Sequence, residues 1–113
     1  MNDLIEEIIN ASVNNGVKVI QIDGNRIHNK TTFIKEFAGK LKFPDYFGNN
    51  WDSFNDCITD LSWFEQGNIL IIFWDSERFR VSNPEDWQTA SNIIFDAIDY
   101  WKNQEKHLAI MIV

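Results

Sequence analysis

The sequence feature that most constrains the fold is a continuous apolar run, NILIIFWD, at residues 68–75. The run has the length of a β-strand, yet it lacks the alternation of apolar and polar positions that a strand with one solvated face shows. Strands of this kind are covered on both faces and are typical of parallel sheets. We therefore expect a buried strand within a sheet that helices cover.

Two further segments have strand character, and helical patterns separate the three. VKVIQID at residues 17–23 is followed by a turn at Gly24 and Asn25, and LAIMIV closes the chain at residues 108–113. The segments with apolar residues at helical spacing are 3–14, 31–41, 51–61 and the stretch from Pro84 through Trp101. The expected apolar stripe of the first is Leu4, Ile5, Ile8 and Ala11, and that of the last is Trp87, Ala90, Ile94, Ala97 and Trp101. Strands separated by helices predict a small α/β domain with a mainly parallel sheet.

Two asparagines precede predicted helices. Asn50 stands before Trp51, and Asn83 stands before Pro84, which suits the first position of a helix. Asparagine side chains accept hydrogen bonds from the free N–H groups at a helix start, so we expect both residues to be N-caps.

The size and composition fit one folded domain, since 113 residues with 44% hydrophobic content suffice to bury a core. No apolar run approaches the roughly 20 residues that a membrane-spanning helix requires. The N-terminus, MNDLIEEIIN, is acidic where a secretory signal is basic. Cys57 is the single cysteine, so an internal disulfide is excluded. These features lead us to expect a cytoplasmic protein with no membrane partner.

The net charge of −7 is concentrated in one segment. Between Phe43 and Glu77 the chain has seven acids and no base, whereas the remainder holds ten acids and ten bases. The excess charge therefore creates a local field. Such a field repels nucleic acid, which proteins bind through lysine and arginine. We expect a cationic partner and no nucleic acid.

Three of these acids share one side of the predicted helix at residues 51–61. Side chains three or four positions apart lie together on a helix, so Asp52, Asp56 and Asp60 form a ridge opposite the apolar stripe. Like charges at this spacing destabilise an isolated helix by roughly 0.2 to 0.5 kcal/mol per pair. The ridge is either a solvated surface, as most charged helix faces are, or a binding surface.

The loop at residues 43–49 places aromatic residues beside this ridge. Aromatic anchors next to carboxylates are typical of protein interfaces. Aromatic residues beside a helix are more often part of the core, so we expect Phe47 and Trp51 to be buried and Tyr46 to be exposed. Cys57 has a position on the apolar side of the helix and is expected to be a buried, unreactive thiol.

The stretch FPDYFGNNWDSFNDCITDLSW, residues 43–63, resembles the signature of the barstar family, intracellular protein inhibitors of barnase-type ribonucleases. The matching features are a proline and an acid, two aromatics, a glycine, and then asparagine, two aspartates and a threonine. The resemblance extends from about Val17 to the end of the chain. It implies one barstar-like domain over residues 1–113, with two layers, a three-stranded parallel sheet and an added helix at residues 1–14.

In barstar-like inhibitors the loop and the following helix plug the nuclease active site, where carboxylates replace the substrate phosphates. The resemblance therefore implies a one-to-one complex with a basic ribonuclease and a monomer when free. It implies neither catalysis nor a cofactor or metal. The residues that it assigns to partner binding are Tyr46, Gly48, Asn50, Asp52, Asn55, Asp56, Thr59 and Asp96. Asp56 is the leading candidate for the largest contribution to affinity.

Two positions depart from the founding inhibitor of the family. Asn55 stands where that inhibitor has a tryptophan, and Phe47 stands where it has a second loop tyrosine. The target could therefore equally be the nuclease domain of an interbacterial toxin, with this chain as its immunity protein. Leu61 and Trp63 lie in a segment that is longer than in the founding inhibitor, so their contact with the partner is left open.

Functions of two other classes remain alternatives. Asp52 and Asp56 could hold Mg²⁺ in a phosphotransfer or hydrolytic enzyme, although the sequence nominates no further ligand or base. The acidic surface could also bind another basic protein, such as a ribosomal or regulatory factor.

Overall fold

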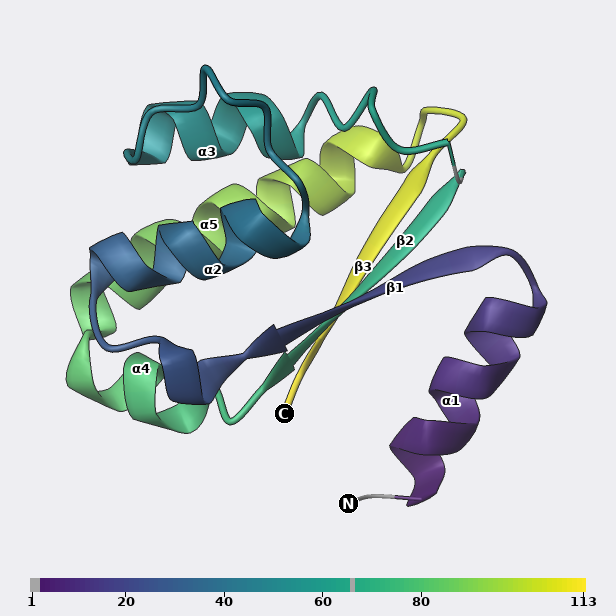
Figure 1. Ribbon diagram of the computed structural model, residues 1–113, viewed down its shortest axis with the longest axis horizontal. Coiled ribbons are helices and arrows are strands. Elements are labelled where there is room, and N and C mark those ends of the chain that lie inside the picture. The colour runs from purple at the N-terminus through teal and green to yellow at the C-terminus, as the bar shows by residue number, and fades with distance from the viewer. Residues whose placement is uncertain (1–2, 66) are drawn as a thin grey trace.

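A computed structural model describes residues 3–65 and 67–113, which form a three-stranded sheet with helices packed against it (Figure 1). In chain order the elements are α1 (Asp3–Asn14), β1 (Val17–Asp23), the short 3-10 helix η1 (Gly24–Arg26), α2 (Lys30–Lys40), α3 (Trp51–Ile58), β2 (Asn68–Trp74), α4 (Glu77–Ser82), α5 (Pro84–Trp101) and β3 (His107–Ile112). The predicted α/β class with a parallel sheet and an N-terminal helix is confirmed.

The apolar run at residues 68–75 supplies the central strand. The strand order is β1-β2-β3, all parallel, and Ile71 of β2 pairs with Ile20 on one side and Ile110 on the other. Successive side chains of a strand point to opposite faces. Ile71 and Ile72 are both fully buried, so β2 is covered on both faces as the sequence predicts.

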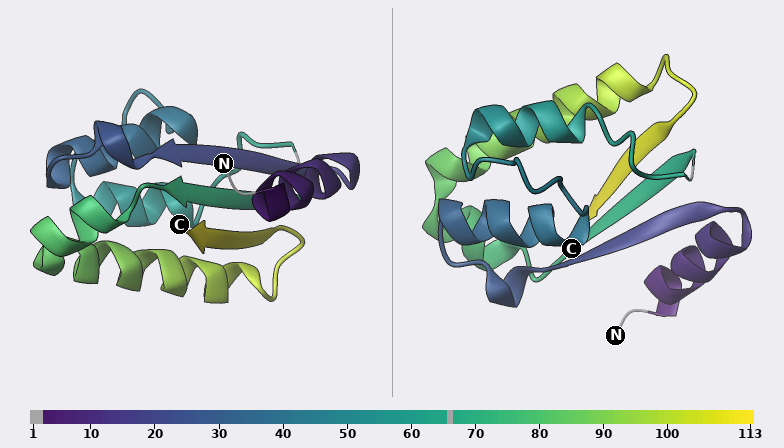
Figure 2. Two further views of the ribbon diagram at one scale, coloured as in Figure 1. Left: turned by 90° about the horizontal axis from the view of Figure 1, so that it is seen from below. Right: turned by 45° about the horizontal axis from the view of Figure 1, so that its top comes forward.

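Helices α2, α3 and α5 cover one face of the sheet, and α1 packs on the opposite face against β1 (Figures 1 and 2). Between the helices and the sheet lies an aromatic core. The ring of Phe33 in α2 lies 4.4 Å from that of Phe37 and 4.8 Å from that of Phe79, and it also contacts Phe54 of α3 and Phe73 of β2. This cluster fixes α3 against the sheet through its inner side.

Helix α3 is shorter than predicted, since it ends at Ile58 and not at Leu61. A longer helix would use the Ile58 carbonyl for its own backbone bond, but this oxygen accepts a hydrogen bond from Trp101 Nε1 at 2.9 Å. Leu61 then turns back into the core with a left-handed φ of 47° and is fully buried. The distant indole therefore coincides with the end of the helix.

Asn83 takes the N-cap position of α5, as predicted, but it does not make the expected side-chain cap hydrogen bond. Its Nδ2 donates instead to the His28 carbonyl at 3.4 Å. The cause is the unpredicted helix α4, whose last turn also ends at Asn83. One residue serves both helices, with backbone angles set by the end of α4 and by the following proline.

Helix α1 contacts the sheet through a narrower surface than its sequence pattern indicates. Of the expected apolar stripe, Ile5 is buried and Ile8 is half-buried, whereas Leu4 and Ala11 are exposed. No helix in the described part of the chain is both long and apolar enough to cross a membrane.

Candidate functional site

Helix α3 starts at a well-formed asparagine cap. Oδ1 of Asn50 accepts a hydrogen bond from the N–H of Ser53 at 2.8 Å, and the N–H of Asn50 donates to the Gly48 carbonyl at 2.8 Å. A Cβ at Gly48 would lie 2.9 Å from Asn50 Nδ2 and 3.2 Å from Ser53 Oγ, so a larger residue would disturb the cap. The predicted cap at Asn50 is confirmed, and Gly48 and Asn50 shape the surface from within.

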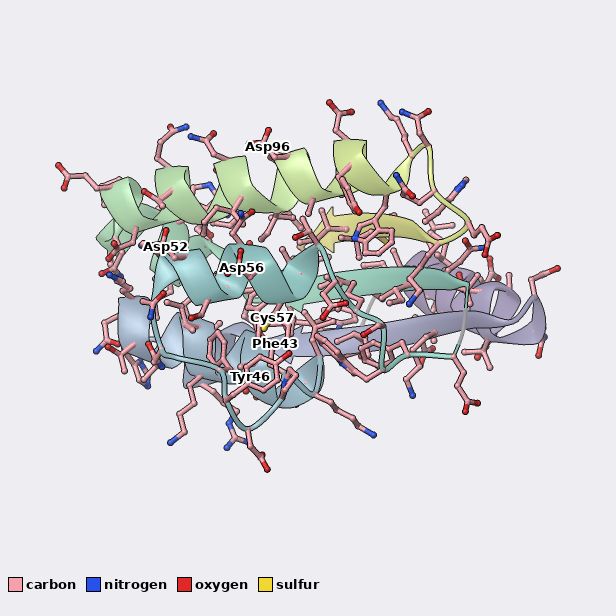
Figure 3. The ribbon with its side chains drawn as sticks, turned by 90° about the horizontal axis from the view of Figure 1, so that it is seen from above. Phe43, Tyr46, Asp52, Asp56, Cys57 and Asp96 are labelled. Atoms are coloured by element: carbon pink, nitrogen blue, oxygen red, sulfur yellow. The ribbon has the colours of Figure 1, made fainter. Side chains whose placement is uncertain are left out.

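The loop before α3 is anchored by two phenylalanines. The rings of Phe43 and Phe47 lie 5.1 Å apart, and Phe43 also packs at 5.8 Å from Phe54 in the core. Between them Tyr46 is 80% exposed, as expected, and lies beside α3 (Figure 3). Phe47 and Trp51 are half-buried, so the expectation that they are buried holds only in part.

Asp52 and Asp56 lie on the same side of α3, facing away from the sheet (Figure 3). Both are exposed. In residues 3–65 and 67–113, the ion pairs of acidic side chains involve Glu36 and Asp99. No cation therefore neutralises the described carboxylates of the loop and helix, namely Asp45, Asp52, Asp56 and Asp60.

The field of these acids extends to the inner side of the helix. Cys57 is buried, as expected, and lies under the acidic surface. Burial raises the pKa of its thiol, and the negative charges of Asp60 and Asp56 raise that pKa further. The carboxylates of Asp56 and Asp60 therefore disfavour ionisation of a thiol on the inner side of the helix.

The C-terminal end of α3 changes the predicted ridge. Thr59 is the C-cap, and its hydroxyl donates to the Asn55 carbonyl at 2.8 Å, so the hydroxyl proton is already committed to the backbone. Asp60 follows the helix in the next turn. Of the three aspartates predicted to form a ridge, only Asp52 and Asp56 lie on the helix, and Asn55 is exposed beside them. Asp60 lies beyond the end of the helix.

Two residues near the C-terminus hold this end of α3, and sequence reasoning missed their role. Trp101 Nε1 donates to the Ile58 carbonyl, and Lys106 Nζ donates to the carbonyls of Leu61 and Phe64. The Lys106 ammonium also lies 5.7 Å from the centre of the Trp101 ring. Trp101 was expected only as a core residue, and nothing in the local sequence around Lys106 signals a contact with residues 58–64.

The remaining candidates lie apart from the acidic pair. Asp96 is exposed on α5, a different helix from that of Asp52 and Asp56 (Figure 3). Leu61 is fully buried, and Trp63 is half-buried with Nε1 donating to the Leu41 carbonyl at 2.8 Å. The candidate residues from Tyr46 to Thr59 therefore lie on one loop and the helix that follows it. Asp96 lies on a different helix.

A metal site would need several ligands around one point. Among the residues that the structure describes, no group of three or more His, Cys, Asp or Glu side chains is placed to hold a metal ion. Asp52 and Asp56 lie one helical turn apart, but no third ligand joins them among the described residues.

Comparison with known proteins identifies a family and a relative. Residues 17–113 match the family model described as Barstar (barnase inhibitor). The chain is also similar to a protein of Bacillus subtilis (strain 168) named "Putative ribonuclease inhibitor YrdF", with 33% identity over 67 residues that cover 59% of this chain and 67% of that protein. The family match begins at the first residue of β1, so α1 lies outside it.

Proposed function

The chain belongs to the barstar family, and we propose that it inhibits a barnase-like ribonuclease by inserting α3 and its preceding loop into the basic active site. The observation that carries the proposal is the exposed pair Asp52 and Asp56, which no cation of the described chain neutralises. The name of the B. subtilis relative, a ribonuclease inhibitor, supports the same class of function. Family and relative point to an inhibitor and not to an enzyme.

The proposed mechanism is mimicry of phosphate charge. A ribonuclease binds the RNA backbone through cationic side chains, so its active site attracts any correctly spaced pair of carboxylates. Asp52 and Asp56 are one helical turn apart, and each can accept charge-assisted hydrogen bonds in place of a phosphate. The complex blocks RNA entry without any chemical step.

Aromatic area adds to the charge. Tyr46 is 80% exposed at the tip of a loop whose flanking phenylalanines are packed. Tyrosine contributes a large contact area at a low cost in side-chain entropy, and it is enriched among residues that dominate binding energy. We assign Tyr46 to an apolar contact beside the charged centre, with Asn55 and Thr59 at the border of the same surface.

The surface is held in shape before binding. The Asn50 cap fixes the start of α3, and Trp101 and Lys106 fix its end through carbonyls of residues 58–64. A preorganised surface loses little conformational entropy in the complex, which favours tight binding. The helix that carries the two Asp side chains is thus already ordered before the partner binds.

The local charge also affects the rate of association. An uncompensated acidic field speeds encounter with a basic partner, and added salt screens it. Asp96 on α5 is assigned to this outer field, where a charge alters the association rate more than the dissociation rate. We propose a one-to-one complex formed by a chain that is monomeric when free.

The direct test mixes the full chain with a barnase-type ribonuclease and follows RNA cleavage. We expect cleavage to stop at a molar ratio of one to one, and inhibition to weaken as the salt concentration rises. Unchanged cleavage with every member of a panel of such nucleases would contradict the proposal. The panel should include nuclease domains of interbacterial toxins, since an immunity function would use the same surface.

A matched pair of double variants tests the site itself. Asp52→Asn with Asp56→Asn removes two charges from α3, and Glu6→Gln with Glu7→Gln removes two from α1 on the other face of the sheet. Both variants change the net charge equally. Only the first is expected to lose inhibition. If both inhibit equally well, the partner binds elsewhere.

A separate assay tests the enzyme alternative. Turnover of a phosphate-ester substrate by the chain alone with Mg²⁺, abolished by a chelator, would favour an enzyme instead.

A further inference from the structure

A basic segment precedes the acidic one in the chain. Residues 17–42 contain six lysines and arginines and only two acids. The structure brings Arg26 of η1 together with Lys35 and Lys40 of α2 around one pocket of about 530 Å³, on a different helix from the acidic surface. Thr32, Glu36 and Gly39 complete its lining. The proposed inhibitory function makes no use of this pocket.

A buried carboxylate positions two of the three cations. Glu36 is only 9% exposed, and its Oε2 accepts a hydrogen bond from the N–H of Asp23 at 2.9 Å. The same oxygen lies 3.2 Å from Lys40 Nζ, and Oε1 lies 3.7 Å from Arg26 Nε. Glu36 therefore holds both cations at the pocket, and Lys40 Nζ also donates a hydrogen bond to the Gln21 carbonyl at 3.1 Å. The contact with Arg26 involves Nε, and within residues 3–65 and 67–113 the two terminal nitrogens of the guanidinium form no ion pair, so they are available to another acceptor.

The charge of the lining is not balanced. Arg26, Lys35 and Lys40 face the single carboxylate Glu36, so the lining carries an excess of two positive charges. Lys35 is exposed, and it forms no ion pair with any residue that the structure describes. Clustered like charges are unfavourable unless a counter-ion binds between them. The pocket therefore suits an anion.

Gly39 contributes no side chain to the lining of this pocket. It lies inside α2, where glycine is destabilising relative to alanine. A Cβ at this position would meet no atom within 4 Å, so packing does not require the glycine. Helix termination does not require it either, because the left-handed residue after α2 is Lys42, with φ of 56°. A side chain at position 39 would therefore extend into open space beside the basic pocket.

We propose that this pocket binds a small oxyanion of the phosphate class through Arg26, Lys35 and Lys40. The guanidinium supplies a forked pair of donors that matches two oxygens of one phosphate, and the ammonium groups supply point charges on either side. The ligand is either free phosphate or the phosphate group of a larger small molecule. Binding at this pocket is independent of the proposed nuclease complex.

The test titrates the isotope-labelled full chain with inorganic phosphate and, separately, with pyrophosphate, with sodium chloride keeping the ionic strength constant. We expect saturable shifts of the backbone amide signals of Arg26, Lys35 and Gly39. Tighter binding of pyrophosphate would favour a phosphorylated ligand, because its additional charge engages all three cations, and equal binding would favour free phosphate. The absence of saturable shifts with both anions overturns the proposal. No nuclease is used, so either result leaves the inhibitory function untouched.

Three variants sharpen the test. Arg26→Gln is expected to lower the affinity about tenfold, the loss of one charge-assisted pair of hydrogen bonds. Lys35→Gln removes one exposed ammonium from the pocket, whereas the control Lys102→Gln removes one from the C-cap of α5, where Lys102 pairs with Asp99. A loss of affinity with Lys35→Gln and not with Lys102→Gln supports the site. Equal losses would show a general charge effect and overturn it.

Gly39→Leu separates ligand binding from folding. The added side chain extends into open space and improves helix propensity, so the melting temperature should rise by about 4 °C. The same side chain occupies the pocket and should reduce anion affinity at least about tenfold. Opposite signs of the two effects support the proposal. A variant that gains stability and keeps full affinity contradicts it.

Discussion

The inner and outer sides of α3 differ in both burial and charge. The inner side carries Phe54, Cys57 and Ile58, all buried, and the outer side carries Asp52 and Asp56, both exposed. Burial of the inner side stabilises the domain, whereas the repulsion along the outer side slightly opposes helix formation. A helix of eight residues thus separates folding from binding by side. Mutations on one side should leave the property of the other nearly unchanged.

The largest expected effect is on the inner side. Phe54→Ala removes a fully buried ring that contacts Phe33, Phe37 and Phe43, and it should lower the free energy of unfolding by about 3 to 5 kcal/mol. Urea denaturation measures the loss. Phe54→Leu keeps most of the volume and should cost far less. A loss below about 1 kcal/mol with Phe54→Ala would mean that α3 is not anchored by this core.

On the outer side, Asp56→Ala should weaken the nuclease complex by about 2 to 5 kcal/mol, because the cations of the partner are left buried without a counter-charge. Stability of the free chain should stay the same or rise by a few tenths of a kcal/mol, about the value of one like-charge pair. Calorimetric titration and thermal unfolding give the two numbers. Asp96→Ala is the control, with an expected effect on the association rate. If Asp56→Ala unfolds the protein, Asp56 is structural and the two sides are not separate.

A residue that supports both sides should give an intermediate result. Lys106→Met removes the donors to the carbonyls of Leu61 and Phe64 but keeps the aliphatic chain, and it should lower the free energy of unfolding by about 1 to 2 kcal/mol. Because the end of α3 loses its support, the complex should also dissociate faster. Lys102→Met, at the exposed C-cap of α5, is the control. An unchanged dissociation rate would show that the acidic pair needs no support from this end.

Local patterns predicted most of the fold. The unbroken apolar run identified β2, and the spacing of Ala90, Ile94 and Ala97 identified the buried side of α5. The unpredicted α4 has six residues and no side-chain cap, so its sequence carries little helical signal. The end of α3 coincides with a hydrogen bond from Trp101, which lies 43 positions from its acceptor at Ile58. Contacts over that separation are not contained in a local pattern.

The candidate site divides in the same way. The shared orientation of Asp52 and Asp56 follows from helix geometry alone, so the sequence was sufficient for it. Asp60 was assigned to the same ridge because the helix was predicted to extend to Leu61, whereas it ends at Ile58. Trp51 was expected to be buried, but it is half-buried, and Lys30 Nζ lies 5.7 Å from its ring centre. Periodicity predicts which side a residue takes, whereas its degree of burial depends on which neighbours cover it.

The smallest expected effect tests whether the charges of the outer side reach the inner side. Burial, Asp60 and Asp56 raise the pKa of Cys57 in the folded protein, so the stability linked to the protonated thiol is complete below the ordinary pKa of about 8.5. Above that pH the unfolded chain releases the proton first, and the free energy of unfolding should fall until the folded thiol also titrates. Other groups titrate in this range, so the measured quantity is the difference between the wild type and Cys57→Ala in urea denaturation at pH 7 to 10. Asp56→Asn with Asp60→Asn should shrink that difference by removing the two charges and leaving the burial. If the difference persists at full size in this double variant, burial alone perturbs the thiol and the field of the acidic surface ends at the helix backbone.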